Sequence, residues 1–332
     1  MPRVLITGGN GFLGSHVAQA LATRDDVDVV VAGDLRAGAP REGVIDATLD
    51  VTDATAIAPV LRQHRIDTVV HLAAIVNPGH DVDLEYRVDV TGSANVLAAC
   101  VEAGVHRIVV SSSGAAYGYH SDNPEWIDED QPLRGNDAFP YARHKRLVEE
   151  MLAEHRRTHP ELQQVIFRIG TILGPTVRNQ ITALWDGSRI LRIAGSESPF
   201  VFVWVDDVAA AMVRAATDGP AGIFNVAGDG RMTVPEIAAR LGKPQLVLPA
   251  WALSSVLRIG RMLRLTPHGP EKVPFLRYRP VLANRRLKEV FGYTPRRTTR
   301  EAFEEYLRAH PAVVGNGGDV VADSPRTAPH IQ

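Results

Sequence analysis

Cysteine is almost absent from this chain of 332 residues, which contains Cys100 alone. A single thiol cannot form a disulfide within the chain, and it leaves too few sulfur ligands for a cysteine-based zinc site. His155 and His159 lie four residues apart, but no acidic partner completes a zinc-protease pattern. We therefore expect no bound metal. A lone free thiol is typical of a reducing compartment, so we expect a cytoplasmic protein.

Long apolar runs and a strong net charge are also missing. No uncharged apolar stretch reaches the roughly 18 residues of a membrane-spanning helix, and the opening MPRVLITGGNGFLG does not resemble a signal peptide. The 36 basic and 38 acidic residues leave a formal net charge of −2. Such a balance produces no overall field that attracts nucleic acid. We expect a small-molecule substrate, no nucleic-acid partner and no membrane span.

Apolar runs of strand length alternate with amphipathic segments of helix length. We predict strands at 3–7, 27–32, 66–74, 107–111 and 164–169, and helices at 12–23, 52–62, 84–103 and 141–159. The strands are continuously hydrophobic, as expected where helices cover both faces of a parallel sheet. The pattern predicts an α/β fold with a Rossmann-type, doubly wound parallel sheet.

The pattern becomes less regular in the second half of the chain, where we predict short strands at 189–193, 200–205 and 223–226 and helices at 207–217, 234–241, 250–263, 284–290 and 299–309. We expect residues 1–175 to form a nucleotide-binding domain and residues 176–310 a smaller, partly interleaved substrate lobe, with some segments returning to the sheet. Residues 311–332 show no periodicity and are predicted to form a disordered tail.

Three glycines lie between the first predicted strand and the first predicted helix. Gly8, Gly11 and Gly14 allow a tight turn and a close approach of a diphosphate to the helix N-terminus. Asp34 follows twenty residues later, where a carboxylate can accept hydrogen bonds from ribose hydroxyls. Such a carboxylate repels a 2′-phosphate, which favours NAD over NADP. The nearby Arg36 keeps NADP open as the less favoured alternative.

Tyr141 and Lys145 are four residues apart on a predicted helix and therefore share one face. Lys145 is the only lysine before Lys243. An ammonium near a phenol favours the phenolate and lowers the phenol's pKa, which makes it a usable acid or base near neutral pH. Serines at 111–113 end the fifth predicted strand, at the sheet edge where ligands bind. A serine there can hydrogen-bond to an alcohol or carbonyl oxygen.

Four segments together resemble the extended short-chain dehydrogenase/reductases, and more narrowly the NAD-dependent epimerase/dehydratase family. They are TGGNGFLG, HLAA, SSSGAAYG and YARHK, and the resemblance extends over about residues 3 to 308. It implies that Ser113 polarises the substrate oxygen, Tyr141 is the acid or base, Lys145 holds the nicotinamide ribose, and Asn95 supports the proton relay. It also implies a homodimer through the helices at 84–103 and 141–159.

The resemblance further implies which residues bind the cofactor. Gly8, Gly11 and Gly14 would wrap its diphosphate, and Asp34 would hold the adenosine ribose. Besides Tyr141 and Lys145, the predicted cofactor site includes Phe12, Leu13, Arg36, Asp50, Val51, Leu72, Ala73 and Ala74.

Two positions depart from the pattern of members that act on nucleotide sugars. Thr171 stands where those members often have asparagine, and Pro199-Phe200 falls near the place of a phosphate-binding arginine. Arg189, Arg192 and Arg231 are alternative candidates for that arginine. These departures favour an NAD-dependent oxidoreductase acting on an apolar or steroid-like alcohol or ketone. A nucleotide-sugar epimerase or dehydratase with tightly held NAD and a non-catalytic NAD-sensing regulator are the alternatives.

The stretch WALSSVLRIGRMLRL, residues 251–265, combines apolar groups with Arg258, Arg261 and Arg264. We expect an amphipathic helix packed on the lobe. A lid over an apolar substrate and a contact with a membrane surface are alternative interpretations.

Overall fold

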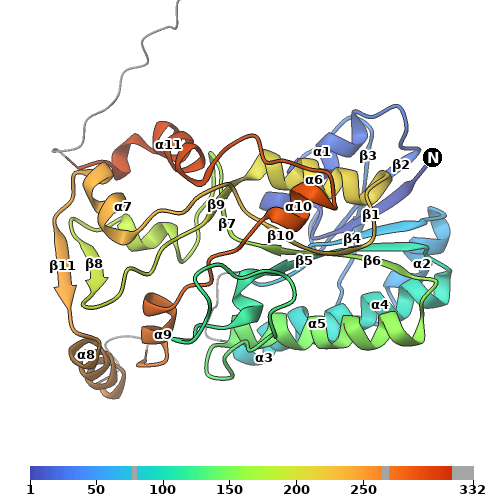
Figure 1. The fold of residues 1–332 in the computed structure, drawn as a ribbon. Helices are drawn as coiled ribbons and strands as arrows, with labels where there is room; N and C mark the ends of the chain where they lie inside the picture. Colours follow the sequence, from blue (N-terminus) through green and yellow to red (C-terminus); the bar gives the residue numbers. More distant parts are fainter. Residues whose placement is uncertain (77–80, 264–268, 316–332) are drawn as a thin grey trace, which may run out of the picture.

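Seven parallel strands form the central sheet of the computed structural model, which describes residues 1–76, 81–263 and 269–315. The strands are β1 (Arg3–Thr7), β2 (Val29–Asp34), β3 (Val44–Thr48), β4 (Thr68–His71), β5 (Arg107–Ser113), β6 (Gln163–Ile169) and β10 (Gly222–Val226). Their order in the sheet is β10-β6-β5-β4-β1-β2-β3 (Figure 1). The predicted Rossmann-type, doubly wound sheet is therefore confirmed.

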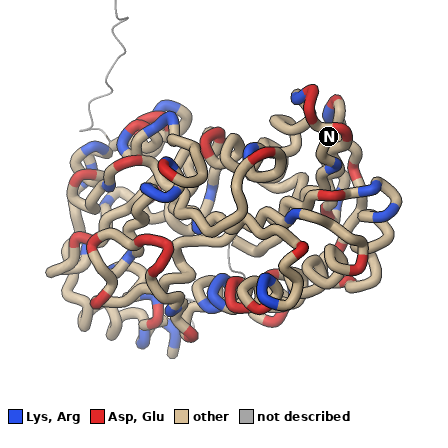
Figure 2. Tube along the Cα trace, turned by 45° about the vertical axis from the view of Figure 1, so that its right-hand side comes forward, with Lys and Arg blue, Asp and Glu red and all other residues tan. Residues whose placement is uncertain are grey.

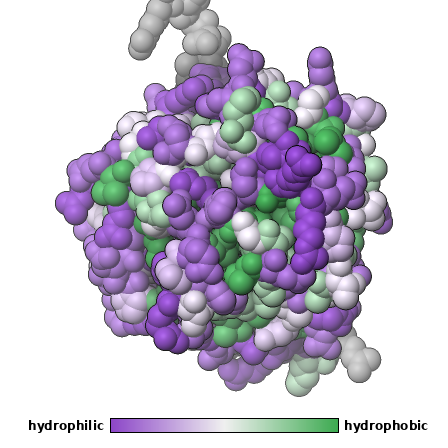
Figure 3. Space-filling view, turned by 90° about the vertical axis from the view of Figure 1, so that its right-hand side faces the viewer, coloured by the Kyte–Doolittle hydropathy of each residue, from purple (hydrophilic) through white to green (hydrophobic). Residues whose placement is uncertain are grey.

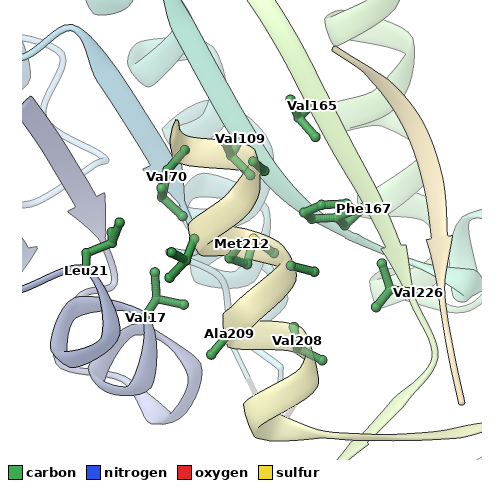
Figure 4. Packing of buried hydrophobic residues seen from close by; sticks show 14 of the residues in the cluster. Val17, Leu21, Val70, Val109, Val165, Phe167, Val208, Ala209, Met212 and Val226 are labelled. Carbon is green, nitrogen blue, oxygen red and sulfur yellow. The ribbon is translucent and has the colours of Figure 1, made fainter. Parts of the chain in front are cut away.

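Helices cover both faces of this sheet. One face carries α1 (Phe12–Ala22) and α6 (Val205–Thr217), and the other carries α2 (Ile57–Gln63), α4 (Gly92–Ala103) and α5 (Pro140–Thr158). Because each face meets a helical layer, the central strands are apolar on both sides. In Figure 4 side chains of α1 and α6 pack against the sheet; those labelled include Val17, Leu21, Met212, Val70, Val109 and Phe167.

A smaller lobe is built beside the sheet by short elements. They are β7 (Thr171–Leu173), β8 (Ile190–Ile193), β9 (Phe202–Trp204), α7 (Val234–Leu241), β11 (Gln245–Leu248), α8 (Ala250–Met262), α9 (Lys272–Arg277) and α11 (Thr299–Ala309). The short helix α10 (Arg285–Glu289) instead packs on strand β10 of the central sheet. Thr233 and Thr298 begin α7 and α11 with capping boxes, which satisfy free backbone N–H groups. Trp185 lies in the lobe's aromatic core, edge-on to Phe202 and Phe303, which stack on each other.

Several predicted elements differ from those observed. The expected single helix over 84–103 is divided into α3 (Val82–Tyr86), a π-helical turn at Arg87–Thr91, and α4. The turn carries Asp89, a buried carboxylate whose contacts come from distant residues, so hydrophobic periodicity does not reveal it. The helix expected at 52–62 begins only at Ile57, because Asp53 hydrogen-bonds within a turn to Thr55. Strands β3, β7 and β11 and helix α9 were not predicted.

The C-terminal segment is described only as far as residue 315. Pro311–Val313 forms a short 3₁₀ helix, and the Gly315 N–H donates to the Leu241 carbonyl oxygen over 2.8 Å. These residues therefore pack on α7, whereas the rest of the tail predicted at 311–332 lies outside the described residues.

The molecular surface is mixed in character. Basic and acidic residues are interspersed along the trace in Figure 2. Figure 3 faces the end of the molecule where the N-terminus lies, and it shows a mainly hydrophilic surface with hydrophobic side chains gathered near its centre. Within the described ranges, no helix combines the length and the apolar character needed to cross a membrane.

Candidate active site

A cavity of about 770 Å³ lies at the carboxyl ends of the central strands. Gly8 follows β1, Leu72 follows β4 and Ser113 ends β5, and all three residues line it. The strand order reverses between β1 and β4, and ligands of open parallel sheets bind in the crevice at such a reversal. The smaller lobe closes the other side with residues that include Phe275 and Arg279.

The glycine turn forms one wall of the cavity. Gly8 has a φ of +68°, and a Cβ on it would lie 2.9 Å from the Ala73 backbone nitrogen. A Cβ on Gly14 would overlap the carbonyl oxygen of Gly8. The Gly11 N–H donates to that same oxygen over 3.0 Å, which closes the turn at the start of α1. Bare backbone at a helix N-terminus is the cradle that a dinucleotide diphosphate requires, so these residues fit NAD.

Asp34 lines the cavity at the end of β2. Its Oδ2 accepts a hydrogen bond from the Asn10 N–H at 3.0 Å, and its Oδ1 accepts one from the Leu35 N–H at 2.8 Å. The glycine turn therefore fixes the carboxylate at the cavity wall. Arg36 is not among the described residues that line the cavity; its carbonyl accepts a hydrogen bond from the Asn10 side chain at 2.8 Å.

The structure brings most of the other predicted cofactor residues into the same wall. The cavity is lined by Phe12, Leu13, Asp50, Val51, Leu72, Ala73 and Ala74. Asn95 is not among the lining residues, and its Nδ2 donates to the Val51 carbonyl oxygen over 2.9 Å. Its amide therefore holds the segment that carries Val51 rather than reaching the cavity itself.

Ser113, Tyr141 and Lys145 all line the cavity. Tyr141 and Lys145 come from successive turns of α5, and the Lys145 Nζ lies 5.7 Å from the centroid of the Tyr141 ring. The same Nζ donates to the Ser111 carbonyl oxygen over 2.9 Å, which ties the buried ammonium to β5. The Ser113 Oγ accepts a hydrogen bond from the Ala115 N–H at 3.2 Å. A phenol, an ammonium and a hydroxyl thus meet at one sheet edge.

A buried histidine lies behind this group. His71 ends β4, and its two ring nitrogens contact Thr7 Oγ1 at 2.7 Å and Ser93 Oγ at 2.9 Å. Burial, together with the charge of Lys145, lowers the pKa of His71 to about 4, although Asp89 acts in the opposite direction. His71 is therefore neutral at physiological pH. The sequence analysis assigned no role to His71. The feature that could have revealed it is its position, as a polar residue at the end of an otherwise apolar strand.

A buried ion pair anchors α5 to the sheet. Arg168 of β6 contacts Glu149 of α5 at 2.8 Å, and the Ser112 hydroxyl donates to the same carboxylate. Arg168 also donates to the Tyr117 hydroxyl over 2.8 Å. Glu149 is one turn beyond Lys145, and Ser112 precedes Ser113, so this cluster fixes the elements that carry the catalytic candidates.

Arg279 is a second functional candidate that sequence reasoning missed. Its Nη1 donates to the Ser198 carbonyl oxygen over 2.9 Å and to the Ser198 Oγ over 2.6 Å. The guanidinium carbon lies 3.9 Å from the centroid of the Phe200 ring, and the Nε has no partner among the described residues. Burial lowers the pKa of Arg279 to about 9, with Tyr119 acting against it. None of the described carboxylates forms an ion pair with this cation.

Comparison with known proteins connects this geometry to a family. The sequence model of the NAD dependent epimerase/dehydratase family matches residues 4–227. An uncharacterized protein of Mycobacterium tuberculosis is 28% identical over 319 residues, which cover 92% of this chain and 83% of that protein. The UDP-glucose 4-epimerase of Azospirillum brasilense is 38% identical over 181 residues, 52% of this chain and 50% of that protein.

Solved structures agree with the sequence relatives. The UDP-glucose 4-epimerase of Thermus thermophilus, crystallised with NAD, superposes with a TM-score of 0.71 at 26% identity, over 93% of this chain and 98% of that one. The predictions of an NAD cofactor and of an NAD-dependent enzyme are confirmed at the level of the family. This chain belongs to the NAD-dependent epimerase/dehydratase family, within the extended short-chain dehydrogenase/reductases.

Proposed function

We propose that this enzyme acts on the sugar of a nucleoside diphosphate sugar, as an epimerase or dehydratase that keeps its NAD. Ser113, Tyr141 and Lys145 are the proposed catalytic residues. The observation that carries the substrate class is Arg279, a half-buried arginine in the wall of the cavity that also contains Tyr141, whose Nε is buried and has no hydrogen-bond partner among the described residues. The proposal reverses the preference for an apolar substrate drawn from Thr171 and Phe200.

A cation partly removed from water without a carboxylate partner carries a desolvation cost, because it loses part of its hydration and no opposite charge replaces it. The desolvation of Arg279 is offset only in part, by its hydrogen bonds to Ser198 and by its contacts with the ring faces of Phe200 and Phe275. A diphosphate entering the cavity would supply the missing negative charge, and guanidinium–phosphate hydrogen bonds are among the strong ones. An apolar alcohol or ketone would leave the charge unmatched.

The relatives support the same class of substrate. The names of several of them, among them the Azospirillum brasilense and Thermus thermophilus proteins, describe UDP-glucose 4-epimerases. In addition, the cavity's volume of about 770 Å³ is within the range of small-molecule and cofactor sites.

NAD, when bound, supplies the acceptor and donor of the hydride. The protein's own residues move the proton and hold the reacting oxygen. Tyr141 takes the proton from the substrate hydroxyl as the carbonyl forms and returns it when the alcohol is restored. The Ser113 hydroxyl donates a hydrogen bond to the same oxygen, and the Lys145 ammonium, 5.7 Å from the centroid of the Tyr141 ring, would hold the nicotinamide ribose.

A second candidate is a dehydrogenase acting on an apolar alcohol or ketone. Phe139 and Phe275 stack with ring centroids 5.5 Å apart, and both line the cavity together with Phe200. These aromatic faces would also suit a hydrophobic ring system.

Binding of UDP distinguishes the two candidates. Calorimetric titration of UDP into the NAD-saturated enzyme should show binding, and Arg279→Leu should weaken it at least about ten-fold, as expected for a lost hydrogen bond to a charged group. Arg279→Lys should weaken it less, because the charge stays. Arg285→Leu, at an exposed arginine, is the matched control.

NAD affinity, measured in each variant, shows whether the site remains folded. Wild-type enzyme that binds NAD but not UDP, and that oxidises an apolar alcohol, would overturn the nucleotide-sugar proposal. Conversion of a nucleotide sugar, followed by chromatography, would complete the assignment.

A further inference from the structure

Helix α8 presents an apolar face to solvent. Five large apolar side chains on it, and on the residue that follows it, are more than half exposed: Trp251 (74%), Val256 (62%), Ile259 (52%), Met262 (74%) and Leu263 (57%). The helix lies at the end of the molecule opposite the N-terminus (Figure 1). Leu246 and Val247 of the preceding strand β11 are also exposed. An apolar surface of this kind marks a site of association.

The helix has three distinct faces rather than the two faces of an ordinary surface helix. At about 3.6 residues per turn, Leu253 and Leu257 point together into the lobe, where they pack beside Ile193 and Val273. A polar strip carrying Arg258 and Arg261 comes next. The five exposed apolar side chains, with Ser255 among them, occupy the remaining arc, which points away from the protein. Packing on the lobe therefore accounts for only one of the two apolar faces.

The charged residues of the helix itself are all basic. The chain has no aspartate or glutamate from Pro244 to Pro270. Arg258 and Arg261 are both exposed on the helix, and Arg261 reaches across to Glu271 at 3.0 Å. An apolar face bordered by arginine, with tryptophan at one end, is the arrangement of helices that lie in the interface of an anionic membrane.

Two other occupants fit less well. No residue of α8 lines the cavity, so the helix is not a lid over the substrate. A second copy of the chain would find a face of only about 20 Å by 10 Å, or roughly 200 Å², against about 800 Å² per partner in a stable interface. Pairing through α8 would also bring the arginines of both copies together.

We propose that α8 docks this enzyme on an anionic lipid surface, with the apolar arc inserted among the lipids and the arginines at their headgroups. The proposal is independent of the substrate class. Flotation with vesicles tests it, using phosphatidylcholine alone and an equal mixture of phosphatidylcholine and phosphatidylglycerol. The full-length enzyme should float with the anionic vesicles, and added salt should weaken this binding.

The variant Val256→Ser/Ile259→Ser should bind the anionic vesicles at least about ten-fold more weakly, since it removes several inserted carbons. Arg258→Gln should reduce the binding and its salt dependence. Val290→Ser is the matched control, because Val290 is 61% exposed on a different part of the surface. All variants should keep NAD affinity, which shows that they fold.

Failure of the wild-type enzyme to float, or equal flotation of the double serine variant, would overturn the proposal. Light scattering that shows a dimer converted to a monomer by the double variant, without flotation of the wild type, would assign the face to a second copy instead.

Discussion

Tyr141 and Lys145 owe their proximity to one helix, whereas Ser113 comes from a strand. The hydrogen bond from the Lys145 Nζ to the Ser111 carbonyl oxygen joins the two elements two residues before Ser113. The arrangement is therefore held by the backbone of β5, and it does not depend on mobile surface side chains.

Replacement of Tyr141 by phenylalanine tests its proposed role. The variant removes only the hydroxyl that moves the proton, so turnover should fall at least about 100-fold while NAD affinity is kept. Steady-state kinetics and NAD titration measure the two effects. Tyr119→Phe removes the same atom from another tyrosine of the cavity wall and should cost far less. Near-normal turnover of the Tyr141 variant would refute the assignment.

Asp34 is expected to select the cofactor. Asp34→Ser removes the carboxylate that would bind the ribose hydroxyls and repel a 2′-phosphate, so NAD should bind more weakly and the preference over NADP should narrow. Titration with both cofactors measures the ratio. Asp46→Ser, on the neighbouring strand β3 and outside the cavity wall, is the control. Tighter binding of NADP to the wild-type enzyme would contradict the prediction.

At the scale of elements, the buried cluster around Arg168 joins β5, β6 and α5. Its members come from positions 112, 117, 149 and 168, which the chain separates widely. A buried ion pair is not in itself strong evidence of stability, because desolvation offsets much of the attraction. Loss of one partner is a different matter, since it leaves the other charge buried alone.

Arg168→Met should therefore destabilise the enzyme by roughly 3–5 kcal/mol, with Glu149 left uncompensated. Urea unfolding measures the change. Arg157→Met removes an exposed arginine paired with Glu154 on the same helix and should cost no more than about 1 kcal/mol. The double variant Glu149→Met/Arg168→Met should be less destabilised than Arg168→Met alone, because it leaves no unpaired charge buried. If Arg157→Met and Arg168→Met lowered the free energy of unfolding equally, the buried ion pair would not be important for stability.

The regular elements were well predicted where the signal is local. Buried strands such as β1 and β6 are continuously apolar, and α5 is strongly amphipathic, so their bounds were predicted within about two residues. The exposed edge strand β3 was missed because half-polar segments lack that signal. The π turn at Arg87–Thr91 was missed because it depends on contacts of Asp89 with Ile75 and His144.

At the scale of the whole molecule, the buried neutral His71 couples folding to pH. Its folded-state pKa, about 4, lies below the ordinary value of 6.5, so the unfolded chain binds a proton that the folded chain rejects between these values. Its stabilising contribution is complete above about pH 6.5 and is lost as the pH falls towards 4. From pH 7 to pH 5 this residue should cost about 2 kcal/mol in the free energy of unfolding.

Urea titrations across this pH window test the coupling. His71→Gln should show a shallower dependence, because glutamine cannot take up the proton. His106→Gln, at an exposed histidine just before β5, should keep the wild-type slope. Parallel curves of unfolding free energy against pH for wild type and His71→Gln would contradict the prediction.

The homodimer through the helices at 84–103 and 141–159 and the cytoplasmic location both stay predictions.

The sequence by itself determined the features that depend on near neighbours along the chain. The glycine turn, Asp34 at the end of a strand and the Tyr141–Lys145 spacing follow from strand and helix geometry, which repeats over a few residues. Only the tertiary structure decided what enters the cavity from a distance. Arg279 meets Ser198 across 81 residues, and no local pattern encodes such an approach. The lobe likewise decided which apolar face of α8 is buried and which faces solvent, because a helix with two apolar faces does not specify its own partner.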